Sequence, residues 1–320
     1  SSPHILATLS ITLKIWKTFM TISSVEKSAE VSVSVSADIA IIGGSGLYQM
    51  QDLTNKRSVS ISTPYGKPSD DIVLGELNGV KVAFLTRHGQ GHKFTPSEVP
   101  YRANIYALKT LGVRYVISVS AVGSLREALK PLDMVIPDQM IDMTKHRNSS
   151  FFGEGAVAHV AMADPLCPKV ADILTRAYVH AQIAEGQCHA KATYVCIEGP
   201  QFSTRAESHW YRQMNADIIG MTNMPEAKLA REASMAYATL ALVTDFDSWH
   251  PTEEDVSADY AIQNLMKNAG NAQQVIKEAV ALLAAEQPKS IAHNALAQAL
   301  VTPVEAMSEE TKTRLSALLP

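Results

Sequence analysis

From Ala37 onwards, short β-rich apolar runs alternate with longer stretches of helical periodicity, and this alternation limits the possible folds more than any other feature. The first run, residues 38–42, is almost continuously apolar and ends at Gly43-Gly44-Ser45-Gly46, which predicts a buried strand that leads into a tight loop. No repeat, low-complexity block or Pro/Gly-rich linker interrupts the alternation. The sequence therefore predicts one α/β domain, with a mixed central β-sheet flanked by helices.

Further strand signals follow at intervals along the chain. The clearest is a hairpin, in which two runs of strand-forming residues meet at Asn78-Gly79, the dipeptide most typical of a two-residue turn. The predicted strands after the first are residues 72–77 and 80–85 of the hairpin, 115–120, 134–136, 193–197 and 239–244.

Three N-cap patterns predict where helices begin, because a Ser or Thr side chain can accept a hydrogen bond from a free N–H of the first turn. They are Ser97, for a helix ending near Leu111; Thr204 with Glu207, for a helix ending near Met214; and Thr252 with Asp255, for a long amphipathic helix. The residues from 291 onwards predict one or two more amphipathic helices.

The ends of the chain stand apart from this pattern. Residues 1–36 are predicted to be a poorly ordered leader or extension, with residues 31–36 a spacer or an added strand. Residues 5–20 are apolar but carry Lys14 and Lys17, so they are too short and too charged to span a membrane. They resemble a transit segment, or Met20 is the physiological start. Residues 37–287 are predicted to form the main domain and residues 288–320 a helical extension.

The overall charge and the cysteines exclude several classes of function. The chain has 320 residues with 28 Lys+Arg and 32 Asp+Glu, a net charge of 28 − 32 = −4, whereas partners such as nucleic acid or an anionic membrane select basic surfaces. Cys167, Cys188 and Cys196 form no CxxC pair, and no Cys/His cluster has zinc-ligand spacing. We therefore expect no metal site, and free thiols in a reduced, cytoplasmic setting.

Three loops that follow predicted strands offer anion-binding groups. The glycines around Ser45 expose backbone N–H groups, Arg87 places a planar guanidinium in the loop Thr86–His92, and residues 118–124 add small residues and hydroxyls. Each has an ordinary alternative, since a Gly-rich turn needs no ligand and an arginine after a strand is usually solvated. Together the three strand ends could enclose one phosphate.

Two later segments offer groups for an organic ligand. Residues 197–204 present Phe202 and Ser203 at the start of a predicted helix, and Asp245 and Asp247 end a predicted strand two residues apart. Paired acids can bind a metal, cap a loop, or accept hydrogen bonds from the ring nitrogen and amino group of a base. From the residues alone, capping or solvating the next loop is as good an interpretation.

These segments, in this order, resemble the methylthioadenosine branch of the trimeric purine nucleoside phosphorylase family. The resemblance runs from about Ile39 to Val280, and several long motifs at matching spacing carry it. They are Thr63-Pro-Tyr-Gly-Lys-Pro-Ser69, Arg87-His88-Gly89, Ile197-Glu-Gly-Pro200, Arg205-Ala-Glu-Ser208 and Thr244-Asp-Phe-Asp-Ser-Trp249.

The resemblance implies a role for each matching position. Phosphate binding is implied for Ser45, Arg87, His88 (through its backbone), Ser120, Ala121 and Thr222. Met221 is implied to lie under the sugar, and Phe202 and Ser203 to line the base pocket. The catalytic pair Asp245 and Asp247 is implied to contact N7 and the 6-amino group of the base, and His92 and His159 to lie near the 5′ end of the nucleoside. It also implies a homotrimer, with hexamers possible, in which a neighbour helps to close the 5′ pocket.

The implied reaction is phosphorolysis of 5′-methylthioadenosine, a pentosyl transfer with phosphate as co-substrate and no cofactor. Anionic phosphate would stabilise the positive charge that builds on the sugar, and an acid donating to N7 would relieve the departing purine. Aspartates also favour an amino group over O6, because ionised aspartate cannot donate a hydrogen bond. Ser45 and Ser120 replace family threonines, and Ala258 and Ala261 replace valines at the 5′ pocket, which predicts a looser pocket.

Four alternatives stay open at this point. A broader adenosine or 6-oxopurine phosphorylase would cleave inosine well, and a nucleosidase would work without phosphate. A dinucleotide-dependent oxidoreductase would want GxGxxG, which Gly43-Gly-Ser-Gly46 lacks. A non-catalytic nucleoside-binding protein would have no use for Arg87, Asp245 and Asp247 together.

Overall fold

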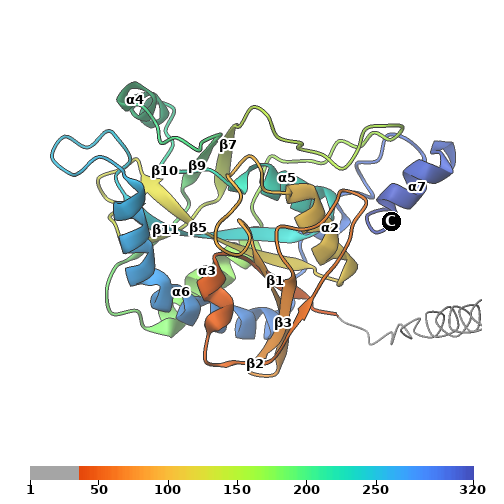
Figure 1. Ribbon diagram of the computed structural model, residues 1–320, viewed down its shortest axis with the longest axis horizontal. Helices are drawn as coiled ribbons and strands as arrows, with labels where there is room; N and C mark the ends of the chain where they lie inside the picture. The colour runs from red at the N-terminus through yellow and green to blue at the C-terminus, as the bar shows by residue number, and fades with distance from the viewer. Residues whose placement is uncertain (1–35) are drawn as a thin grey trace, which may run out of the picture. The chain divides into compact units, whose positions relative to one another are not determined.

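An eleven-stranded mixed sheet organises residues 36–320, the part of the chain that the computed structural model describes (Figure 1). Its path runs β2-β3-β4-β1-β5-β10-β9-β7, while β11 pairs with β5 and β6, and β6 pairs with β8. The strands are β1 (Ile39–Gly43), β2 (Leu53–Val59), β3 (Ile72–Leu77), β4 (Val80–Thr86), β5 (Tyr115–Ser124), β6 (Met134–Ile136), β7 (Gln139–Met143), β8 (Cys188–Ala190), β9 (Thr193–Ile197), β10 (Ile218–Gly220) and β11 (Ala236–Asp245). This confirms the predicted α/β class with a mixed sheet.

Six α-helices and three short 3-10 helices surround this sheet within the described residues. They are η1 (Ser45–Gln49), α2 (Tyr101–Thr110), α3 (Pro168–Ala181), α4 (Arg205–Gln213), α5 (Asn223–Glu232), α6 (Ala258–Glu286), η2 (Ile291–Asn294), η3 (Val304–Ala306) and α7 (Glu309–Leu315). Helices α3 and α6 pack on each other and on β11, and α2 packs on α5. None of these helices combines the length and the apolarity needed to cross a bilayer.

The predicted strands are found, although two are longer than their apolar runs suggest. The hairpin β3–β4 pairs Leu77 with Val80 around Asn78-Gly79, as the turn signal predicts. Strand β5 continues to Ser124 and β11 begins at Ala236, because β5 and β11 pair in parallel along nearly their whole length and are buried together. The predicted ends of these two strands lie where β-branched residues become less frequent in the sequence.

Two predicted helix starts are wrong. Helix α2 begins at Tyr101 after Pro100, and the Ser97 side chain donates to Glu198 instead of capping. A proline disfavours helical backbone at the residue before it, which keeps residues 97–99 out of the helix. Helix α6 begins at Ala258, where the Ser257 side chain accepts from the N–H of Tyr260, so Thr252 is not its cap. The capping box of Thr204 and Glu207 at α4 is confirmed.

The C-terminal residues, for which one or two amphipathic helices are predicted, contain one short helix, α7, and two 3-10 helices. They pack on the rest of the chain, burying Leu296, Leu315 and Leu318. Figure 1 shows α7 and the C terminus at the opposite end of the molecule from α4. The predicted leader, up to residue 35, lies outside the described residues.

Candidate functional site

Strand β5 continues after its pairing with β1 stops, and we call this break in the pairing the gap at β1. Arg87, Ser120 and Ala121, three of the candidate phosphate residues, lie next to it. Strand β1 stops at Gly43, whereas β5 continues past it, so Ser120 and Ala121 extend beyond the last β1 residue and pair only with β11. Arg87 directly follows β4, and its N–H donates to the carbonyl of Gly43 at 3.0 Å. In open α/β sheets, ligands bind beyond the carboxyl ends of the strands at such a change in strand order.

Arg87 is buried beneath this gap and holds several parts of the site together. Its Nε and Nη2 donate to the two carboxylate oxygens of Glu226, both at 2.8 Å. Nη1 donates to the carbonyl of Val119 at 3.0 Å, and Nη2 to the hydroxyl of Ser118 at 2.6 Å. Burial alone would lower the pKa of Arg87, but the Glu226 carboxylate overrides it and holds that pKa above its ordinary value. The guanidinium therefore stays charged in a dry position.

His88 and His92 form a stacked pair at the rim of the gap, with ring centroids 4.1 Å apart. His88 Nδ1 lies 2.9 Å from the carbonyl of Phe94, so this nitrogen carries the proton. Burial, with the Arg87 charge adding to it, lowers the pKa of His88 to about 4. The His88 ring is thus neutral at neutral pH, and its Nε2 is an acceptor unsuited to an anion, which fits a backbone role for His88.

The turn between β10 and α5 carries Met221 and Thr222, two further candidate site residues. Met221 follows β10, and its sulfur fills the space where a side chain at Gly199 would lie. Gly199 has a φ of +61°, so a larger residue there would be both strained and in collision with Met221. Thr222 is the N-cap of α5 and is buried, yet its side chain makes no capping bond. Its hydroxyl is therefore available to a ligand.

Asp245 and Asp247 lie buried at the carboxyl end of β11. One Asp245 oxygen accepts from the Thr244 hydroxyl at 2.7 Å, and the other accepts from the Asp247 N–H at 2.8 Å. Burial raises the pKa of Asp245, and these two hydrogen bonds only partly oppose it. Burial also raises the pKa of Asp247 to about 6, and the Asp245 charge adds to the rise. Both acids are therefore easier to protonate than exposed carboxyls.

Several buried polar atoms around these residues have no hydrogen-bond partner among the described residues. They include Asp247 Oδ2 and the hydroxyls of Ser120, Ser203 and Ser208, although Ser203 and Ser208 lie close enough to Asp247 to lower its pKa. Native proteins rarely bury such atoms unsatisfied, because each costs about 1–3 kcal/mol. Their concentration on β5, β11 and the start of α4 indicates that a polar ligand completes this site.

A titration of stability would test the environment of Asp247. The pKa rises from 3.8 to about 6 on folding, so the folded protein loses stability as pH rises through 4 to 6, by up to about 3 kcal/mol. Asp247→Asn removes this cost, and we expect a higher melting temperature than wild type at pH 8. The gain should shrink to about half at pH 5. Thermal unfolding scans at both pH values measure it; a gain that does not depend on pH would contradict the raised pKa.

The remaining candidates lie at the edges of this site. Ser45 begins η1 directly after Gly44, so the glycine loop continues as a 3-10 turn. The Phe202 side chain is 42% exposed, so its ring is accessible to a ligand. His159 is exposed, and its N–H donates to the carbonyl of Ala299 at 2.9 Å. Within residues 36–320, no hydrogen bond or ring stacking joins the His159 side chain to the other candidates, so the structure does not bring it into the cluster.

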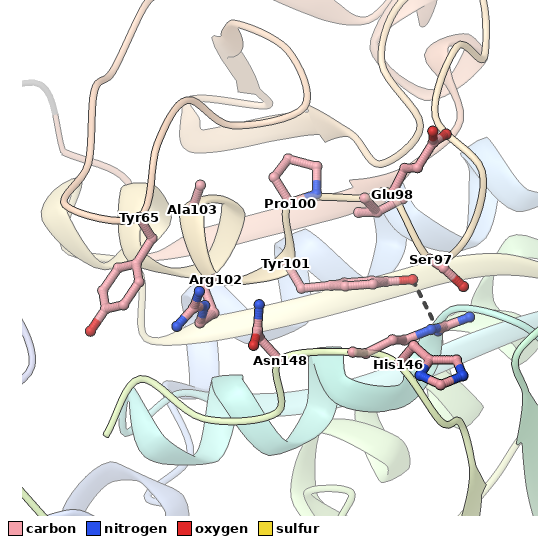
Figure 2. A pocket seen from close by; sticks show the side chains of 11 residues that line it. Tyr65, Ser97, Glu98, Pro100, Tyr101, Arg102, Ala103, His146 and Asn148 are labelled. Atoms are coloured by element: carbon pink, nitrogen blue, oxygen red, sulfur yellow. Dashed lines mark hydrogen bonds between the residues drawn. The ribbon is translucent and has the colours of Figure 1, made fainter. Parts of the chain in front are cut away.

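Sequence reasoning missed a second buried network beside the site. Arg147 donates to Glu198 at 2.8 Å and to the carbonyls of Met221 and Met224 at 2.6 and 2.7 Å, and so fixes the turn between β10 and α5. Tyr101 lies beside Arg147 in a polar pocket of about 220 Å³ at the start of α2 (Figure 2). Glu198 lies within the Ile197–Pro200 motif, and this motif is the only sequence feature that could have pointed to the Arg147–Glu198 network.

The candidate site combines hydrogen-bond donors with a pair of acids. Within residues 36–320, no three His, Cys, Asp or Glu side chains gather closely enough to hold a metal ion. Candidate phosphate-binding residues follow β1 and β4 or lie on β5, and β5 pairs with β11, the strand that ends at Asp245. Such a site can hold an anion beside a leaving group that needs a proton.

Comparison with known proteins agrees with this geometry. An S-methyl-5′-thioadenosine phosphorylase of Synechocystis sp. (strain PCC 6803 / GT-S) is 56% identical over 288 residues, 90% of this chain and 88% of that protein. A crystal structure of a methylthioadenosine phosphorylase from an antarctic soil metagenomic library is 87% identical, with a TM-score of 0.87, and covers 89% of this chain and 100% of its own.

A methylthioadenosine phosphorylase from Schistosoma mansoni, solved in complex with adenine, is 39% identical with a TM-score of 0.74, over 78% of this chain and 93% of that one. Residues 38–281 match the family described as the phosphorylase superfamily. The match covers most of the sheet and both sides of the site. The chain therefore belongs to the phosphorylase superfamily.

Proposed function

We propose that this protein splits 5′-methylthioadenosine with inorganic phosphate, giving adenine and 5-methylthioribose-1-phosphate, a step of purine and methionine salvage. The observation that carries the proposal is the pair of buried, easily protonated acids at the end of β11, on the same sheet edge as Arg87 and Ser120. The names of the similar proteins from Synechocystis and the antarctic soil library point to the same reaction.

In the proposed reaction a phosphate oxygen bonds to C1′ of the ribose while the C1′–N9 bond breaks. The electron pair of that bond moves into the purine, and Asp245 gives a proton to N7, so adenine leaves as a neutral base. Phosphate held by Arg87, Ser120 and the backbone at Ala121 lies on the other side of the sugar and stabilises its positive charge. No protein nucleophile is required, because phosphate is positioned to attack.

Asp247 accounts for the choice of base. An ionised carboxylate accepts a hydrogen bond from the 6-amino group of adenine, but it repels the O6 of hypoxanthine or guanine. Its Oδ2 atom is buried and free to accept. Leaving such a group without its partner discriminates strongly between substrates. Ser203, beside it, supplies a further hydroxyl for the base.

The 5′ end and the assembly complete the proposal. We propose that His92, which stacks on His88, lines the 5′ end of the site. We further propose that the exposed His159 acts in the site of a neighbouring subunit of a homotrimer. Ala258 and Ala261 occupy the first turn of α6 and leave room around the 5′ substituent. We place the protein in the cytoplasm, which its three free cysteines support.

The proposal is tested by assaying adenine release from 5′-methylthioadenosine at saturating phosphate, beside hypoxanthine release from inosine. We expect kcat/KM for methylthioadenosine to exceed that for inosine by about 10²-fold or more, since the buried Asp247 carboxylate would face O6. Comparable rates on both nucleosides would contradict the assigned base pocket. Brisk inosine cleavage alone would favour the broader 6-oxopurine phosphorylase.

A further inference from the structure

The Arg87–Glu226 pair stands out among the ion pairs of the described chain because both partners are buried. Their exposed fractions are 2% and 1%. In every other ion pair described between residues 36 and 320, at least one side chain is 19% exposed or more. Removing two charges from water is expensive, and a buried pair adds little net stability. A role other than stability would explain why this pair lies directly under the gap at β1.

Counting donors shows what Arg87 can still offer. A guanidinium has five N–H groups. Four of them are directed to Glu226, Ser118 and the Val119 carbonyl. No group among the described residues accepts a hydrogen bond from the fifth N–H, on Nη1, so this N–H is left for a ligand. Arg87 therefore meets an anion through a single donor, and its charge is already balanced by the carboxylate.

Glu226 is itself fixed from a second direction. The hydroxyl of Tyr237 on β11 donates to Glu226 Oε1 at 2.8 Å, while Arg87 occupies both carboxylate oxygens. The carboxylate is thus held between β4, α5 and β11, and it cannot turn away when an anion arrives. Neutral donors dominate the rest of the phosphate side, where Ser120 contributes an unpartnered hydroxyl and the His88 ring is uncharged.

We propose that Glu226 tunes the phosphate site by neutralising and aiming Arg87, so that bound phosphate keeps most of its own negative charge for the sugar. This inference rests on the proposed function. A free guanidinium would bind ground-state phosphate more tightly and would withdraw charge from the attacking oxygen, and tighter ground-state binding does not raise kcat. Glu226 is in this sense a positioning residue, acting through Arg87 rather than on the substrate.

The first test compares Glu226→Gln with Glu232→Gln, its matched control. Glu232 lies on the same helix and is also buried, but its carboxylate accepts from Ser150 and the Phe151 N–H and does not touch Arg87. We expect Glu226→Gln to lower the phosphate KM and the phosphate Kd by about tenfold while lowering kcat, with the nucleoside KM unchanged. Glu232→Gln should leave phosphate Kd as in wild type. A phosphate Kd that rises or stays constant in Glu226→Gln would overturn the proposal.

A comparison of Arg87→Gln with the double variant Arg87→Gln/Glu226→Gln keeps the test decisive if Glu226→Gln alone folds poorly. Arg87→Gln leaves the Glu226 charge facing the anion, so phosphate binding measured by calorimetry should collapse. Adding Glu226→Gln should restore affinity by about tenfold, the coupling expected of a close charge pair. Equal affinity in Arg87→Gln and the double variant would refute the role of Glu226. Wild-type turnover that ignores phosphate would instead contradict the proposed function itself.

Discussion

Replacing Asp245 with asparagine is expected to lower kcat for adenine release by about 10²-fold or more, the usual contribution of a general acid. The amide can still donate a hydrogen bond toward N7, but it cannot transfer a proton to the departing base. Because burial raises the pKa of Asp245, the wild-type carboxyl is suited to carry that proton. Steady-state rates with methylthioadenosine at saturating phosphate measure the loss.

The control for this substitution is Asp172→Asn on the exposed face of α3, where the carboxylate is 62% exposed and pairs with Arg176. It should retain wild-type kcat. Both variants are isosteric, so a fall confined to Asp245→Asn reports chemistry rather than folding. A kcat for Asp245→Asn within a few-fold of wild type would show that adenine leaves without help from this acid.

The second large effect is expected from Gly123→Ala. A Cβ at Gly123 would lie 2.8 Å from Asp245 Oδ1 and 3.0 Å from Ile219, so one of them must move. The Asp245 carboxylate can move more easily than Ile219, and moving it breaks the hydrogen bond that it accepts from the Asp247 N–H. Displacing a catalytic group by about 1 Å can cost about 10²-fold, and we expect kcat to fall by that order.

Gly270→Ala is the matched control, since a Cβ there would meet nothing within 4 Å and the residue lies inside helix α6. It should keep full activity and gain about 0.5–1 kcal/mol of stability. Crystal structures of both variants would locate the Asp245 side chain. If Gly123→Ala keeps wild-type kcat, the position of Asp245 matters less than proposed.

Local signals in the sequence predicted much of the fold. The Asn78-Gly79 hairpin and the Thr204 capping box depend on neighbouring residues alone, and both are present. The start of α6 was misplaced because Thr252 and Ser257 both carry cap-forming hydroxyls, and packing selects Ser257. Helices α3 and α5 were not predicted; α5 is buried on nearly all sides, which removes the amphipathic periodicity that identifies a helix.

The candidate site could be predicted from the sequence only where its residues lie close together in the chain, within a short motif. Arg87 and the pair Asp245–Asp247 stand in compact motifs, and the structure buries each of them beside the gap or at the end of β11. Glu226 lies 139 residues from Arg87 in the chain, and no local pattern links two such residues. The Arg147–Glu198 pair, 51 residues apart, escaped for the same reason. Which residues form these ion pairs depends on the topology of the sheet, and the hydrophobic periodicity of the sequence does not specify that topology.

The central claim is that phosphate, and not water, attacks the sugar. The most direct measurement follows methylthioadenosine turnover in phosphate-free buffer and again with phosphate, and detects the sugar product by ³¹P NMR. We expect adenine to appear only with phosphate, together with one equivalent of a sugar 1-phosphate. Adenine released at the same rate without phosphate, with free methylthioribose as product, would contradict it and would make the protein a hydrolase.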